Sequence, residues 1–245
     1  MTTHPARPGL LARAFAWTGG ALFVLALVAG AYFYLLVLNA SPTGGGPPGA
    51  AAVAINVALF ALFAAHHSLL ARDASKAWIA AHVPPYLERP LYVWVASLLF
   101  IGLCAWWQPI AGYAWRLEGG WSWAGRGAQV LGLVCSAIGA RALNAFELAG
   151  IRQVRTAHGT SRPIDTAITT AGLYGWVRHP IYMGWVFMVL GTPDMTWGRF
   201  VFAAVSIAYL VVAIPWEERS LVGEFGQAYR DYQAQVRWRL VPGIY

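Results

Sequence analysis

Two short polar blocks lie at the two ends of an apolar hairpin in the last part of the chain. Residues 178–184 have the sequence RHPIYMG, and residues 217–221 have the sequence EERSL. Arginine binds anions, histidine can move protons near neutral pH, and carboxylates accept hydrogen bonds from hydroxyl and ammonium groups. Charged side chains at the mouths of membrane helices are costly, so their presence there indicates a functional site.

The elements that position these blocks are predicted to be membrane helices. Hydrophobic residues make up 58% of the 245-residue chain, charged residues 11%, and the mean hydropathy is +0.52. A soluble domain of ordinary composition has about a quarter of its residues charged. Residues 14–71 contain no Asp, Glu, Lys or Arg, which leaves room for two spans of about 20 residues separated by a turn at 41–49 (SPTGGGPPG). Further spans are predicted at 90–108 and 122–143.

The pattern as a whole predicts an all-α, polytopic membrane helix bundle with five to six transmembrane helices. Residues 14–143 hold four spans, and residues 144–245 hold a helical hairpin and a polar C-terminal segment. The hairpin consists of two shorter apolar runs, 179–193 and 200–216. We expect residues 1–245 to form a single membrane-embedded domain.

The distribution of basic residues predicts the orientation of the spans. All seventeen Lys and Arg residues except Arg116, Arg126 and Arg199 fall on the side that holds both termini. By the positive-inside rule, this side is cytoplasmic. The net charge of +7 is then explained by topology and by contact with anionic membrane lipids, not by nucleic acid binding. We expect an inner-membrane protein whose site faces the cytoplasm.

Residues that could bind a metal or haem have simpler explanations. Cys104 and Cys135 lie in predicted spans and have neither C-x-x-C nor Cys/His ligand spacing, which indicates buried thiols and no metal site. His66 and His67 could be haem or quinone ligands, although a hydrogen-bonded buried histidine is the more common case. His67 also remains a candidate for the wall of the active-site pocket.

The two polar blocks resemble the C-terminal region of the isoprenylcysteine carboxyl methyltransferase and phospholipid methyltransferase superfamily. The similar segments are 172–174 (GLY), 178–184 (RHPIYMG), 217–218 (EE), 225–226 (FG) and 241–243 (VPG). Membrane sterol reductases resemble the same region, so a reductase that uses a nicotinamide cofactor is one alternative.

Upstream segments resemble a bacterial branch of this superfamily that contains methanethiol S-methyltransferases and NnrU-like membrane proteins. They are 67–72 (HSLLAR), 88–93 (ERPLYV) and 146–154 (FELAGIRQV). Where members of this branch have Glu-Arg-Ser or Glu-Arg-Thr, this chain has Glu88, Arg89 and Pro90. The resemblance implies a bacterial protein of the inner membrane.

The resemblance implies S-adenosylmethionine as the cofactor. Arginine at a helix N-terminus suits its carboxylate, a glutamate suits its ribose hydroxyls or ammonium, and aromatic rings suit its adenine and sulfonium. The expected cofactor-binding residues are Tyr174, Arg178, His179, Pro180, Tyr182, Glu217 and Glu218.

The bacterial branch implies a small thiol as the methyl acceptor, with methanethiol giving dimethyl sulfide. A thiol has a pKa of about 8.5, so the protein must favour the thiolate. His179 could accept the proton, or an arginine could stabilise the thiolate. The expected catalytic residues are His179, Arg152 and Glu147, and the expected substrate-binding residues are His67, Arg152 and Gln153.

Two further alternatives follow from the same resemblance. A lipid amine, a lipid carboxylate or a prenylcysteine as acceptor would require a lateral opening between helices toward the bilayer. An NnrU-like accessory membrane protein of nitrogen-oxide metabolism would have no enzymatic activity and should not bind S-adenosylmethionine.

Overall fold

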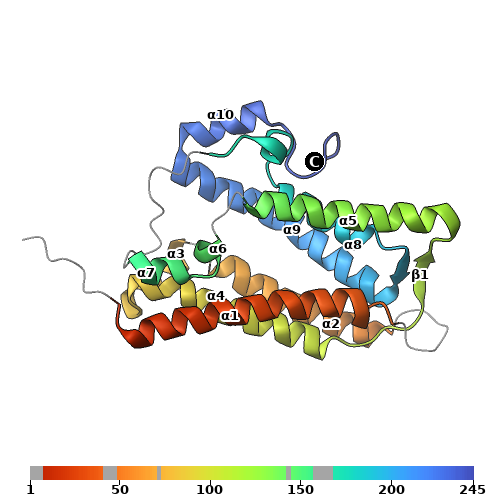
Figure 1. The fold of residues 1–245 in the computed structure, drawn as a ribbon, viewed down its shortest axis with the longest axis horizontal. Coiled ribbons are helices and arrows are strands. Elements are labelled where there is room, and N and C mark those ends of the chain that lie inside the picture. Colours follow the sequence, from red (N-terminus) through yellow and green to blue (C-terminus); the bar gives the residue numbers. More distant parts are fainter. Residues whose placement is uncertain (1–7, 41–48, 71–72, 142–144, 157–167) are drawn as a thin grey trace, which may run out of the picture. The chain divides into compact units, whose positions relative to one another are not determined.

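The predicted all-α membrane architecture is confirmed by the computed structural model (Figure 1). The residues that it describes are 8–40, 49–70, 73–141, 145–156 and 168–245. Four described helices are long and apolar enough to cross a membrane. They are α1 (Leu10–Tyr32, continued by the π-helical turn η1, Phe33–Val37), α2 (Ala50–Leu69), α4 (Pro85–Trp106) and α9 (Trp197–Phe225).

The remaining predicted spans correspond to two helices of different lengths. Helix α5 (Gly119–Arg141) occupies the predicted fourth span, and α8 (Pro180–Leu190) forms the first arm of the last hairpin. Helix α8 has only 11 residues, whereas α9 has 29. The two arms of the hairpin therefore differ greatly in length, whereas the sequence pattern predicted that both would be short.

Helix α9 is long because it continues through its interior Pro215. Proline removes a backbone N–H donor and usually kinks or ends a helix. Here the helix continues to Phe225, so Glu217 and Glu218 lie within it, whereas the apolar pattern placed them after its end. Successive residues of an α-helix are rotated by about 100° around the helix axis, so these two side chains point in different directions.

Short elements connect these helices. The helical ones are α3 (Asp73–His82), α6 (Ala145–Leu148), α7 (Ile151–Thr156), the 3-10 turn η2 (Gly172–Gly175) and α10 (Gln227–Gln235). The strands β1 (Tyr113–Arg116) and β2 (Asp194–Thr196) pair antiparallel. This strand pair was not part of the all-α prediction, because neither segment is long enough to show a period of two.

The chain divides into two compact units. Unit 1 comprises Met1–Val37, Ala58–Trp107 and Leu143–Ile164. Unit 2 comprises Leu38–Val57, Gln108–Ala142 and Asp165–Tyr245.

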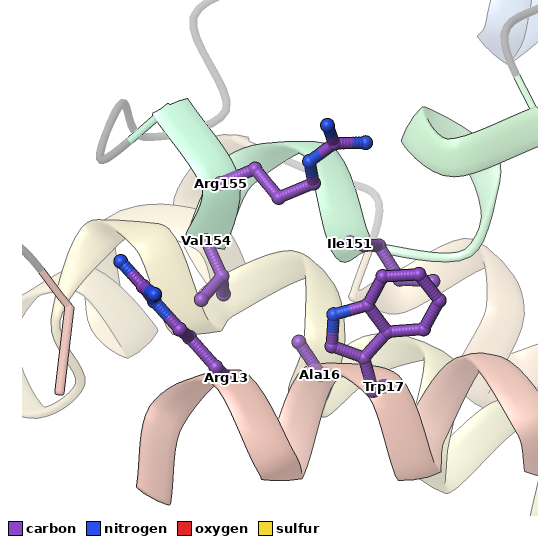
Figure 2. A pocket seen from close by; sticks show the side chains of 6 residues that line it. All are labelled: Arg13, Ala16, Trp17, Ile151, Val154 and Arg155. Atoms are coloured by element: carbon purple, nitrogen blue, oxygen red, sulfur yellow. The ribbon is translucent and has the colours of Figure 1, made fainter. Parts of the chain in front are cut away.

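In unit 1, α1 packs along α4 and against α7 through small residues. A methyl group on Gly19 would collide with the Trp94 ring of α4, and one on Gly20 would collide with Ile151 of α7. Such small residues let membrane helices approach closely. The indole Nε1 of Trp94 donates to the Phe15 carbonyl at 2.9 Å, which fixes the register of α1 on α4. Figure 2 shows a pocket between α1 and α7.

In unit 2, α8 packs along α5 with close backbone contact (Figure 1). A side chain on Gly132 of α5 would collide with the backbone of Gly184 in α8, and one on Gly184 would collide with Ser136. The Ser136 hydroxyl donates to the Ile181 carbonyl at 3.2 Å. Thr196 accepts a hydrogen bond from the Arg199 N–H at 3.1 Å and so caps the start of α9.

Candidate functional site

The entry to α8 pairs with the segment that follows α10. Val177 forms a parallel bridge with Trp238. The N–H of Arg178 donates to the Trp238 carbonyl at 2.9 Å, and the N–H of His179 donates to the Arg239 carbonyl at 2.9 Å. Pro180 then begins α8, where its missing N–H costs nothing. The backbone thus holds the first predicted polar block against the C-terminal segment.

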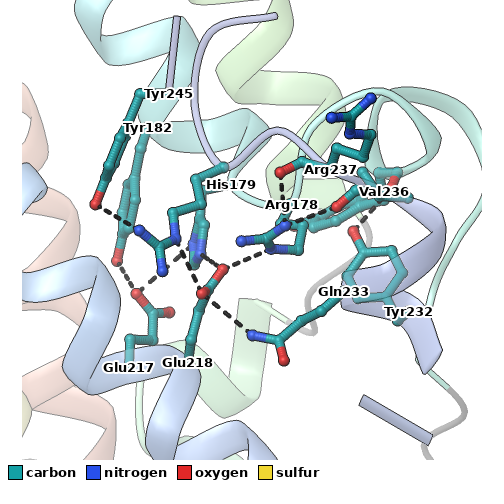
Figure 3. A network of polar contacts seen from close by, with 12 residues as sticks. Arg178, His179, Tyr182, Glu217, Glu218, Tyr232, Gln233, Val236, Arg237 and Tyr245 are labelled. Atoms are coloured by element: carbon teal, nitrogen blue, oxygen red, sulfur yellow. Dashed lines mark hydrogen bonds and ion pairs between the residues drawn. The ribbon is translucent and has the colours of Figure 1, made fainter. Parts of the chain in front are cut away.

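Glu218 is the centre of the cluster, and it bonds to groups from three parts of unit 2. Its Oε1 accepts a 2.6 Å hydrogen bond from Arg178 Nε and lies 3.3 Å from His179 Nε2. Its Oε2 accepts from Gln233 Nε2 at 3.2 Å and from Arg239 Nε at 3.1 Å. Figure 3 shows Arg178 and Gln233 pointing toward the Glu218 carboxylate. Glu218 is only 3% exposed, so this network replaces its hydration.

Two of the three guanidinium nitrogens of Arg178 donate hydrogen bonds to groups of unit 2. Besides the Glu218 carboxylate, its guanidinium contacts two carbonyls, since Nη1 donates to Val236 at 2.7 Å and to Arg237 at 3.0 Å. The Arg178 side chain is 7% exposed. A buried ion pair is favourable only when further hydrogen bonds satisfy both partners, and here they do. The pair therefore fixes the C-terminal segment to the α8 entry.

Glu217 has the opposite environment. Its side chain is 42% exposed. Its Oε2 accepts a 3.0 Å hydrogen bond from the Tyr182 hydroxyl and lies 3.8 Å from His179 Nδ1. The rings of His179 and Tyr182 are parallel, with centroids 5.4 Å apart. This arrangement presents an oriented carboxylate and an aromatic pair at the edge of the buried cluster.

Two tyrosines connect the cluster to η2 and α5. The Tyr232 hydroxyl donates to the Tyr174 carbonyl at 2.8 Å, and the Tyr174 hydroxyl donates to the Gly139 carbonyl at 3.3 Å. Burial raises the pKa of Tyr232 to about 12. Burial and the nearby Glu217 carboxylate raise the pKa of Tyr174 as well. Both phenols are therefore neutral hydrogen-bond donors at physiological pH.

The predicted substrate residues belong to unit 1. His67 Nδ1 lies 2.6 Å from the Tyr92 hydroxyl, so His67 is a hydrogen-bonded histidine. The Arg89 guanidinium lies over the Tyr92 ring, 5.0 Å from its centroid. His66 stacks on Tyr92 at 5.6 Å, and neither of its ring nitrogens has a hydrogen-bond partner among the described residues.

The other predicted residues of unit 1 lie on α6 and α7. Gln153 is 8% exposed, and its Oε1 has no hydrogen-bond partner in the described part of the chain. Arg152 is half-buried. The side chain of Glu147 lies outside what the structure describes.

The structure thus brings the predicted cofactor residues together in one unit, and the predicted substrate residues and Glu147 belong to the other unit. The first group is Tyr174, Arg178, His179, Pro180, Tyr182, Glu217 and Glu218, all in unit 2. The second is His67, Glu147, Arg152 and Gln153, all in unit 1. Gln233 and Arg239 also belong to the cluster, although the sequence pattern did not predict them as site residues. One signal was present, because two adjacent glutamates at a membrane helix need cationic partners and the C-terminal segment carries several arginines.

Comparison with known proteins places this cluster in a family. The family model for the isoprenylcysteine carboxyl methyltransferase (ICMT) family matches residues 130–223, which include α8 and most of α9. Methanethiol S-methyltransferase 2 of Bradyrhizobium diazoefficiens is 36% identical over 205 residues, covering 84% of this chain and 77% of that protein. Methanethiol S-methyltransferase of Mycobacterium tuberculosis is 36% identical over 189 residues, covering 76% of each chain.

The match to eukaryotic relatives is more local. Protein-S-isoprenylcysteine O-methyltransferase of Tribolium castaneum is 37% identical over 75 residues, covering 29% of this chain and 27% of that protein. No solved structure matches the chain.

A membrane helix bundle with this cluster, together with these matches, defines an integral membrane methyltransferase, as the sequence predicted. The chain belongs to the isoprenylcysteine carboxyl methyltransferase family, and its similarity to methanethiol S-methyltransferases extends over most of its length. The chemistry of the family requires a methyl donor.

Proposed function

We propose that this protein methylates methanethiol to dimethyl sulfide with S-adenosylmethionine as the donor. The supporting observation is the similarity to several methanethiol S-methyltransferases over about three quarters of the chain. The isoprenylcysteine relatives match less than a third of it. Because the resemblance to thiol methyltransferases includes unit 1, it supports a small thiol over a prenylated acceptor.

The residues of unit 2 fit the proposed donor. The exposed Glu217 carboxylate, held by the Tyr182 hydroxyl, can accept hydrogen bonds from ribose hydroxyls or from an ammonium group. The half-buried Tyr182 ring, which stacks on the buried His179 ring, offers an aromatic face for adenine or for a positive sulfonium. Glu217 and Tyr182 are therefore the residues that we assign to direct cofactor binding, and His179 supports the Tyr182 ring.

We assign Arg178 and Glu218 a positioning role. The sequence suggested that Arg178 binds the cofactor carboxylate, but its guanidinium donates to Glu218 and to two carbonyls within unit 2. Glu218 receives four polar contacts from the protein. Both side chains are buried and hydrogen-bonded within the protein. They therefore hold the α8 entry and the C-terminal segment in place next to Glu217 and Tyr182.

The proposed reaction is a direct displacement. The bound donor supplies an activated methyl group: a bond forms between the thiol sulfur and the methyl carbon, the bond from that carbon to the sulfonium breaks, and its electron pair stays on the former sulfonium sulfur. The thiol proton leaves to solvent or to a base before or during this step. Alignment of the reacting atoms is the main contribution asked of the protein.

His179 is better suited to holding Tyr182 and the two carboxylates in place than to accepting the thiol proton. Its Nε2 lies 3.3 Å from Glu218 Oε1, and its Nδ1 lies 3.8 Å from Glu217 Oε2. Each ring nitrogen thus already faces a carboxylate. We propose that Arg152 favours the thiolate by its positive charge and that Gln153 and His67 select the acceptor. Gln153 Oε1, which has no hydrogen-bond partner among the described residues, supports this assignment, because it could accept the weak hydrogen bond that the thiol S–H donates before deprotonation.

The test is a two-product assay on the purified protein in detergent. S-adenosylmethionine and methanethiol are added, dimethyl sulfide is measured in the headspace, and S-adenosylhomocysteine is measured in solution. Equal amounts of both products support the proposal. Binding of S-adenosylmethionine without dimethyl sulfide would reject methanethiol and direct the search to lipid acceptors. Two variants accompany the wild type. Glu217→Gln is expected to give less of both products when S-adenosylmethionine is below saturation, and Glu118→Gln, an exposed carboxylate outside the cluster, serves as the control and is expected to remain fully active.

A further inference from the structure

A pocket of about 510 Å³ lies between α1 and α7 of unit 1, and none of the residues assigned above lines it (Figure 2). Its lining residues are Arg13, Ala16, Trp17, Ile151, Val154 and Arg155. Pockets of a few hundred Å³ are large enough for a small ligand or a lipid headgroup. Arg152 and Gln153 are also on α7 but do not line it.

The floor of the pocket is apolar and closely packed. Ala16 is 0% exposed, and Val154 is 2% exposed. The small size of Ala16 and Gly20 lets α7 approach α1, since a methyl group on Gly20 would already collide with Ile151. The floor therefore offers no polar group to a ligand, only an apolar surface.

The rim of the pocket is cationic. Arg13 projects from α1 and Arg155 from α7, and both side chains are exposed (Figure 2). Among the described residues, neither guanidinium has a hydrogen bond or an ion pair, and no acidic side chain lines the pocket. The Arg155 guanidinium lies 5.6 Å from the centroid of Phe146, and Phe146 meets the edge of Trp17 at 6.2 Å. Two positive charges thus lie at one opening, and no counter-ion for them is present among the described residues.

The pocket is placed near the end of a membrane span. Helix α1 is one of the candidate spans and begins at Leu10, which is 84% exposed. Arg13 and Trp17 are four residues apart and so project from the same face of the helix. Tryptophan prefers the membrane interface, and Trp17 is 52% exposed. These positions put the two arginines at the level of lipid headgroups.

We propose that this pocket binds the phosphate headgroup of an anionic phospholipid. The planar guanidinium of arginine can donate two parallel hydrogen bonds to phosphate oxygens. Basic pockets beside membrane helices bind anionic lipid headgroups. The apolar floor and the exposed indole of Trp17 suit the glycerol and acyl portion of a lipid. A soluble anion would gain nothing from them, which is why we choose a lipid over free phosphate.

The experiment is native mass spectrometry of the protein in mild detergent, titrated with phosphatidylglycerol or with phosphatidylcholine of the same acyl chains. The wild type should bind phosphatidylglycerol more tightly. The double variant Arg13→Gln/Arg155→Gln should bind phosphatidylglycerol at least about tenfold more weakly, because it loses two charge-assisted phosphate contacts. Its binding of phosphatidylcholine should fall less, because the choline ammonium already offsets the charge of that lipid's phosphate.

The control is the double variant Arg126→Gln/Arg230→Gln, which removes the same charge from two exposed arginines outside the pocket. It should bind phosphatidylglycerol like the wild type. Equal binding of the two lipids, or equal loss in the control, would overturn the proposal. So would competition by inorganic phosphate at the same concentration as the lipid, because it would identify a site for a soluble anion.

Folding of the variants is checked by their unfolding midpoint in lipid-free detergent. If the double variant unfolds early, Arg155→Gln alone replaces it, since that side chain is exposed and on the surface of α7. The variant Arg13→Lys/Arg155→Lys keeps the charge without the planar fork and should retain part of the lipid preference. A preference that survives in Arg155→Gln at full strength would contradict the site.

Discussion

Glu217 and Glu218 are neighbours on α9, yet the side chain of one is 42% exposed and that of the other is 4% exposed. Glu218 is bound by Arg178, Gln233 and Arg239. Glu217 is bound by the Tyr182 hydroxyl. We therefore propose different roles for the two carboxylates, one in holding the cluster together and one in presenting charge to the cofactor.

Glu218→Gln should destabilise the protein. The substitution removes the negative charge that compensates the buried Arg178 guanidinium, and breaking a buried ion pair in this way costs about 3 kcal/mol or more. A lower thermal unfolding midpoint in detergent checks this. Glu118→Gln, at an exposed position, should unfold like the wild type. An unchanged midpoint for Glu218→Gln would show that the ion pair does not hold the segment.

Glu217→Gln should weaken cofactor binding with little effect on stability. The exposed side chain loses its charge, but its amide can still accept from Tyr182. We expect the Kd for S-adenosylmethionine, measured by calorimetry, to rise about tenfold, as for the loss of one charge-assisted hydrogen bond. A Kd equal to that of the wild type would assign the ligand-facing role to another residue.

Arg152→Ala should change the use of the acceptor and leave cofactor binding intact. If Arg152 favours the thiolate, the variant should have a lower kcat/KM for methanethiol, and part of the loss should be recovered at higher pH, where more thiolate is present. Binding of S-adenosylmethionine provides the control. A loss of cofactor affinity with unchanged acceptor preference would remove Arg152 from this role.

The buried tyrosines should make the protein sensitive to alkaline pH. The pKa of Tyr232 is about 12 in the folded protein, above its value of about 10 in an unfolded chain, so the folded state retains the proton longer. This contribution to stability is complete below about pH 10 and is lost as the pH rises from about 10 to about 12. In the Tyr232→Phe variant, the thermal unfolding midpoint should decrease less steeply as the pH rises over this range. A fall as steep as that of the wild type would assign the effect to other groups.

The predicted orientation can be tested with single cysteines in a variant that lacks Cys104 and Cys135. Glu118→Cys and Asp231→Cys are both at exposed positions. A membrane-impermeant maleimide added to right-side-out vesicles should label Cys at position 118 and spare position 231. Labelling of both positions from the same side would contradict the proposed topology.

The sequence by itself determined the membrane class, the two polar blocks and the family, because composition and contiguous motifs carry that information without any long-range contact. Charged residues are too rare and apolar runs too long for a soluble domain. The blocks at 178–184 and 217–221 are each local in the chain.

Only the tertiary structure decided which residues of these blocks are buried, which are exposed and which other residues contact them. The path of α9 through Pro215 sets the helical phase that buries Glu218 and exposes Glu217. The participation of Gln233 and Arg239 depends on backbone pairing between the α8 entry and the C-terminal segment. No local pattern encodes such pairing, because it depends on the packing of segments that are distant in the sequence.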